Sequence, residues 1–159
     1  MEGLEMQGLD NRTQANAAWM EHQILEHVKN ALRVTLDWKV PSVGIPRKLS
    51  SVQFTLKSFQ RHLERLMDIE EQDGYMVVVA ETKPNMSLRI ERLELEHDTF
   101  REMIRSLLPA VESLSEYQNE EFENICDDIR ILLQQIDRHD AEEIDLLQET
   151  LLCDEGGEG

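Results

Sequence analysis

Five residues of the types that ligate metal ions interrupt apolar helical stripes in this sequence. They are His27, Glu70, His97, His139 and Glu143. Each stands where alternating spacings of three and four residues would otherwise place an apolar side chain facing a helical core. Imidazole nitrogens and carboxylate oxygens are donors that suit iron, manganese and zinc, and a buried carboxylate is costly unless something pairs with it. The pattern therefore predicts a metal cavity.

Four long helices would position these side chains. Capping-box pairs begin two of them, at Ser50 with Gln53 and at Ser115 with Gln118. Modest connections between long helices are typical of an all-α, antiparallel up-down-up-down four-helix bundle. We predict helices from about Thr13 to Trp38, from Ser50 to at least Glu71, from about Pro84 past Leu108, where Pro109 should bend or end the helix, and from about Ser115 to Leu152.

The chain divides into one bundle domain and two tails. We predict the bundle over residues 13–152, a flexible tail over 1–12 and an acidic flexible tail over 153–159. The apolar run Met76–Ala80 could form a short extended piece, or could continue the second helix.

The five candidates lie at similar heights along the predicted helices, so we expect them to share one layer of the bundle. At 1.5 Å per residue, His27 and His97 lie roughly 16–21 Å beyond their helix starts, and an antiparallel topology puts the others at a similar level. We interpret Trp19, Trp38 and Phe100 as core packing. On the first helix the predicted buried stripe is Met20, Ile24, His27, Ala31, Val34 and Trp38.

Composition narrows the class of partner. The 159 residues hold 33 Asp and Glu against 16 Lys and Arg, a net charge of −17. This excess repels phosphate backbones and anionic lipid heads, so neither nucleic acid nor a membrane surface is an expected partner.

The longest wholly apolar run, Met76–Ala80, is too short to cross a bilayer. With no secretory signal pattern and no disulfide spacing between Cys126 and Cys153, we expect a cytoplasmic protein.

Four local strings carry a resemblance to a known family. They are Glu26-His27, Ile69-Glu70-Glu71-Gln72-Asp73-Gly74-Tyr75, Glu96-His97-Asp98 and His139-Asp140-Ala141-Glu142-Glu143. Over about Asn16 to Leu152 the sequence resembles the hemerythrin-like (HHE cation-binding) domain family. In that family a non-haem di-iron centre lies inside a four-helix bundle, and members bind oxygen, sense oxygen or iron, or handle iron and nitric oxide. The resemblance implies that His27, His97 and His139 are terminal ligands and that Glu70 and Glu143 are bridging carboxylates.

The sequence departs from the family pattern at two histidine positions. Leu66 stands at the first, so one iron would lose an imidazole and stay open to dioxygen or a small anion. His62, one turn earlier, or a water could take that place. Arg101 stands at the second, and a guanidinium cannot ligate a cation. It could instead pair with Glu70 or Glu143 and form a metal-free ionic core.

These observations favour a non-catalytic metal-binding protein that holds iron, as a di-iron centre, for oxygen, redox or iron binding, sensing or storage. The alternative is a degenerate, metal-free scaffold that acts through protein partners. Weak oxidase or peroxidase activity at an open ion ranks below both. A ferritin-type site needs two Glu-x-x-His motifs, and only Glu94 to His97 matches.

Overall fold

The protein is built from helices throughout the residues that the computed structural model describes. These are residues 2–41, 44–72, 74–115 and 117–156, with side chains described within 16–150. This part of the chain contains no strand, which confirms the all-α prediction. The elements are α1 (Glu2–Asp37), α2 (Ile45–Gln72), α3 (Tyr75–Thr82), the 3₁₀ helix η2 (Pro84–Met86), α4 (Ser87–Glu112) and α5 (Asn119–Gly156).

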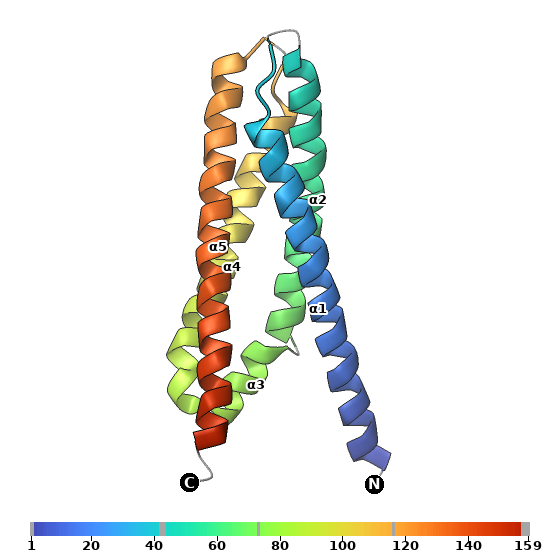
Figure 1. The fold of residues 1–159 in the computed structure, drawn as a ribbon, viewed down its shortest axis with the longest axis vertical. Coiled ribbons are helices and arrows are strands. Elements are labelled where there is room, and N and C mark those ends of the chain that lie inside the picture. The colour runs from blue at the N-terminus through green and yellow to red at the C-terminus, as the bar shows by residue number, and fades with distance from the viewer. Residues whose placement is uncertain (1, 42–43, 73, 116, 157–159) are drawn as a thin grey trace.

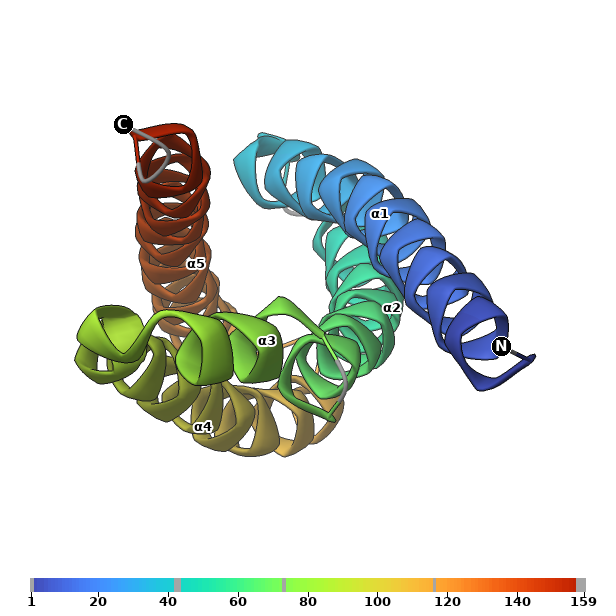
Figure 2. The same cartoon turned by 90° about the horizontal axis from the view of Figure 1, so that it is seen from below.

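The four long helices lie along one axis of an elongated molecule (Figure 1). Both chain ends lie at one end of that axis, and the connections from α1 to α2 and from α4 to α5 lie at the other. The short helix α3 leaves the axis of α2 and crosses toward α4 (Figure 2). None of the described helices has the length and apolar character needed to cross a membrane.

Several predicted boundaries differ from the observed ones. Residues Met76–Ala80 are helical, within α3, so the extended interpretation is wrong. Pro109 lies inside α4, which ends three residues later at Glu112. α1 begins at Glu2 and α5 ends at Gly156, so both helices extend into the segments predicted as tails. Residues 1 and 157–159 lie outside the described residues, and the flexibility of the tails and the domain bounds stay predictions.

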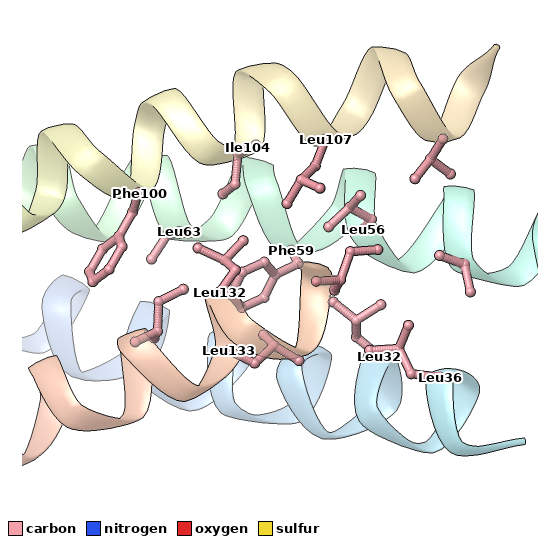
Figure 3. Packing of buried hydrophobic residues seen from close by; sticks show 14 of the residues in the cluster. Leu32, Leu36, Leu56, Phe59, Leu63, Phe100, Ile104, Leu107, Leu132 and Leu133 are labelled. Carbon is pink, nitrogen blue, oxygen red and sulfur yellow. The ribbon is translucent and has the colours of Figure 1, made fainter. Parts of the chain in front are cut away.

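The main apolar core fills the space between α1, α2, α4 and α5 (Figure 3). Phe59 of α2 and Phe100 of α4 are among its largest fully buried side chains. Phe100 was expected in the core, and this is confirmed. Burying each such side chain stabilises the fold by about 1.5–3 kcal/mol. Other members are Leu32, Leu36, Leu56, Leu63, Ile104, Leu107, Leu132 and Leu133.

A second, smaller apolar cluster joins α3 and η2 to α4 and α5. Its members are Met76, Val79, Met86, Ile90, Leu93 and Leu146. On α4 and on α5, the polar positions of the stripes fall between the residues of this cluster and those of the main core. The two clusters therefore enclose a polar layer.

The glycine before α3 allows the chain to turn away from α2. A Cβ atom on Gly74 would lie 2.6 Å from the Ile69 carbonyl oxygen and 2.7 Å from the Cα of Glu70. Backbone atoms cannot be approached so closely by a side chain, so glycine permits this turn. The turn sets the end of α2 and the start of α3 side by side at the polar layer.

The predicted buried stripe of α1 is wrong. Met20, Ile24, Val34 and Trp38 are exposed, as is Trp19, which was also expected in the core. The buried face contains Leu25, Leu32 and Leu36, together with the charged residues Glu21 and Lys29. Both faces of α1 have apolar residues at helical spacing, and the ionic partners of Glu21 and Lys29 on α2 and α5 decide which one faces inward.

Candidate metal centre

Three helices bring four ligating side chains into the polar layer. The last turn of α2 supplies Glu70, and the middle of α4 supplies His97. His139 and Glu143 come from α5, four residues apart and so on one face of that helix. Four of the five candidates predicted from sequence therefore meet here.

The nitrogen and oxygen atoms of three of these side chains converge. His97 Nε2 lies 3.1 Å from His139 Nε2, and Glu143 Oε1 lies 2.7 Å from His139 Nε2 and 3.7 Å from His97 Nε2. One ligand atom of each of the three residues lies within 4.8 Å of the others. The imidazole rings are tilted by 49°, with centroids 4.8 Å apart. Two imidazoles and a carboxylate at such distances can enclose one cation.

Glu70 approaches the same group from α2. Its Oε1 lies 4.0 Å from His97 Nε2. Burial, reinforced by the charge of Glu143, raises the pKa of Glu70 far above its usual value. Burial acts in the same direction on Glu143, but the hydrogen-bonding groups and charges of His139 and His97 outweigh it and lower the pKa of Glu143. A cation beside both carboxylates would remove the repulsion between them.

An outer carboxylate lies beside the Nδ1 atom of each histidine. His139 Nδ1 and Glu96 Oε2 are hydrogen-bonded at 2.8 Å, and His97 Nδ1 lies 3.3 Å from Glu71 Oε1. The ring of Phe100 meets that of His139 edge-on at a centroid distance of 5.2 Å. When each neutral imidazole carries its proton on Nδ1, both Nε2 atoms present lone pairs to the same space. Such carboxylate–histidine pairs commonly support metal ligands.

Three buried polar atoms in the layer lack a hydrogen-bond partner in the described part of the chain. They are the Tyr75 hydroxyl, His97 Nδ1 and Glu143 Oε1. Burial, followed by the charges of Glu143 and Glu70, raises the pKa of Tyr75, so its hydroxyl keeps its proton. Buried polar atoms are satisfied in most proteins. Glu143 Oε1 faces the Nε2 atoms of both imidazoles, and a cation bound by these three atoms would satisfy the carboxylate.

The fifth candidate, His27, lies elsewhere. Its side chain is exposed on the outer face of α1. The prediction that all five side chains share one layer is therefore wrong for His27, because the opposite face of α1 turns inward. Nothing in the described residues brings its imidazole to the cluster.

The residues considered as substitutes for the missing family histidines have other partners. His62 Nδ1 contacts a carboxylate oxygen of Glu21, on α1. Leu66 is buried in the main core. Arg101 binds Glu71 through both of its terminal nitrogens and lies 3.2 Å from Asp68. The proposed pairing of Arg101 with Glu70 or Glu143 is therefore wrong.

Glu71, Tyr75 and Glu96 have places at the site that our sequence reasoning did not assign. Each lies in a family-like string, but none stands on a predicted stripe. Arg101, whose hydrogen bond is the main favourable influence on Glu71, lowers the pKa of that carboxyl against the opposing effect of burial. Glu71 thus remains an anion beside His97. Sequence adjacency to a candidate ligand could have found Glu71, which follows Glu70, and Glu96, which precedes His97. It could not have found Tyr75, which lies on α3.

A second buried ionic group connects α1 to α5 beside this layer. Lys29 contacts Glu26, lies 3.0 Å from Asp137 and lies 3.6 Å from Asp140. Burial, followed by the charge of Glu143, raises the pKa of Asp140 to about 6, and Lys29 opposes this effect. Here the carboxylates have a cation from the protein itself.

A comparison with protein-family models identifies the chain. The model of the hemerythrin HHE cation-binding domain matches residues 13–151. The chain belongs to this family. No curated protein and no solved structure matches it. The predicted resemblance is thus confirmed, and the hemerythrin-like chain has a buried His and Glu cluster that could bind a metal ion.

Proposed function

We propose that this hemerythrin-like protein is a non-catalytic iron-binding protein for oxygen, redox or iron binding or sensing. Its ligands are His97, His139, Glu143 and Glu70. The observation that carries the proposal is the convergence of three ligand atoms within 4.8 Å. Glu143 Oε1 is buried there, close to both imidazoles and without a hydrogen bond among the described residues. A hemerythrin-like domain implies a cation, and the proposal assigns iron to it.

The ligand set supports iron. Two imidazoles with carboxylates leave coordination positions open on a ferrous ion. When bound, iron supplies reversible one-electron chemistry and a position for a small ligand. The four side chains suffice for one ion, and a di-iron centre would share Glu70 and Glu143 between its two ions.

In this proposal the residues around the ligands position them and shield the site from water. Glu96 holds His139, while Glu71, itself held by Arg101, supports His97. The apolar clusters on either side exclude water from the layer. We propose binding rather than catalysis because these titratable groups act as ligands or as supports of ligands. A cytoplasmic location is part of the same proposal.

The direct test is metal content. Full-length protein purified without an affinity tag or chelator would be loaded anaerobically with ferrous iron and measured by plasma mass spectrometry and optical absorption. We expect one or two irons per chain, with little in His97→Ala and Glu143→Ala. Glu142→Ala, at the preceding position of α5, is the matched control and should retain the iron.

The outcomes separate the candidate functions. Two irons per chain would support a di-iron centre, and one would support a single-ion site. No iron after loading, or equal iron in wild type and His97→Ala, would overturn the proposal and favour a metal-free scaffold. Circular dichroism on each variant ensures that lost iron does not reflect lost folding.

A further inference from the structure

The charges of α1 between residues 16 and 36 face into the molecule, whereas Asp37 at its end is exposed. Between residues 16 and 36, its formally charged side chains are buried or half-buried. Glu21 contacts His62 of α2, and Lys29 and Arg33 contact Asp137 of α5. A helix at the edge of a bundle ordinarily turns its charged side to water. α1 does the reverse.

The outward face of α1 is correspondingly uncharged. In a chain with 31% charged residues, none of the exposed side chains between residues 16 and 36 has a formal charge at pH 7. Val34 is 72% exposed and Met20 is 58% exposed. We call this surface the α1 outer face, made of Ala17, Met20, Gln23, Ile24, His27, Asn30, Ala31, Val34 and Trp38.

The α1 outer face is free of other elements. α1 lies at the edge of the helix arrangement, with α2 along one side of it (Figures 1 and 2). From residue 17 to residue 38 the face extends about 30 Å along the helix. An exposed, uncharged face with large apolar side chains such as Met20, Ile24 and Val34 marks an interaction site more often than an ordinary surface.

We propose that this face binds a second copy of the chain, with the two α1 helices packed antiparallel about a two-fold axis. The distribution of charge on the chain supports a second copy as the partner. A cationic partner would be drawn to the acidic remainder of a chain with a net charge of −17, not to its uncharged face. Two copies repel each other through every acidic surface, and the α1 outer face is where they can approach without that cost.

The residue order along the face is self-complementary. In an antiparallel pair centred near His27, Ile24 lies opposite the partner's Ala31, and the two-fold axis repeats this contact on the other side. Met20 then lies beside the partner's Val34. Large side chains meet small ones, as ridges meet grooves in helix packing. A two-fold axis repeats every contact, as an isologous interface requires.

Sedimentation equilibrium of the full chain over a range of concentration and salt tests the proposal. We expect the mass to rise with concentration to twice the 18.5 kDa of one chain. Added salt should strengthen the dimer, because it screens repulsion between two acidic chains. An interface made by ion pairs would respond in the opposite direction.

Substitutions on the face test its register. Val34→Glu should weaken the dimer about tenfold or more, because it adds a buried charge to an interface between two acidic chains. Leu88→Glu, at a 77% exposed position on α4, is the matched control and should have no such effect. The double variant Met20→Lys/Val34→Glu should regain the dimer, since the new cation and the new anion face each other twice.

Three results would overturn the proposal. The first is a mass of 18.5 kDa at every concentration and salt level. The second is equal dissociation by Leu88→Glu and Val34→Glu. The third is a double variant that dissociates more than Val34→Glu alone, which excludes the antiparallel pairing. Circular dichroism checks that each variant is folded, and the substituted positions are exposed, so the substitutions do not disturb the core.

Discussion

Two buried ionic groups lie side by side in this hemerythrin-like protein and differ in how their charges are compensated. Around Lys29, an ammonium group contacts carboxylates from α1 and α5. Around His97, the carboxylates of Glu70 and Glu143 face imidazoles, and Glu143 Oε1 lacks a hydrogen-bond partner among the described residues. The first group needs no ligand, because the chain supplies the cation. The second has the composition that an added cation would complete.

Removing the cation of the first group should have the largest effect on stability. Lys29→Met removes the buried cation that the carboxylates of this group share, although Asp137 still contacts Arg33. We expect the free energy of unfolding to fall by about 3 kcal/mol. Urea denaturation measures this. Arg33→Met, which removes a more exposed partner of Asp137, should cost less than about 1 kcal/mol. If the two variants lose the same stability, the Lys29 group is not the internally compensated cluster described here.

The turn after α2 is expected to matter next, because it aligns the ligands. Gly74→Ala would force a Cβ against the backbone of the last turn of α2 and should cost about 1–3 kcal/mol in urea denaturation. Iron uptake should fall as well, since Glu70 and Tyr75 flank this turn. Gly44→Ala meets the side chain of Val40 rather than backbone and should cost less. An unchanged stability for Gly74→Ala would show that the turn relaxes freely.

A substitution at the metal site should change iron affinity more than the stability of the metal-free protein. Burial raises the pKa of Glu70, so its carboxyl favours the neutral form in the metal-free protein, and Glu70→Gln replaces it with a neutral amide of similar shape. We therefore expect the metal-free protein to keep its stability within about 1 kcal/mol. Iron affinity should nevertheless fall at least tenfold, about 1.4 kcal/mol, because a ligand oxygen is lost. Titration with ferrous iron measures the affinity, and Glu64→Gln on the same helix is the control. Retained affinity would remove Glu70 from the ligand set.

The smallest effect is expected at His27. His27→Ala on the exposed face of α1 should change the stability by less than about 0.5 kcal/mol and leave the iron content unchanged. Plasma mass spectrometry beside His97→Ala makes the comparison direct. A loss of iron as large as in His97→Ala would mean that α1 turns its other face toward the cluster when metal is bound.

Sequence by itself determined most of the fold and most of the cluster. The apolar stripes of α2, α4 and α5 have one face each, so spacing alone identified Leu56, Phe100 and Ile136 as core. The interruptions of those same stripes located Glu70, His97, His139 and Glu143. A polar residue on a helix with one apolar stripe faces the core together with that stripe, and for this reason the sequence located these four side chains.

Only the tertiary structure decided which side of α1 faces inward and which carboxylates Arg101 binds. α1 has two faces with helical apolar spacing, and its periodicity favours neither. The choice depends on ion pairs with residues more than 100 positions away, such as Lys29 with Asp137. Arg101 of α4 likewise binds Glu71 of α2, and not the proposed ligands Glu70 and Glu143. Such pairings are set by the distances between elements, and a linear pattern does not contain those distances.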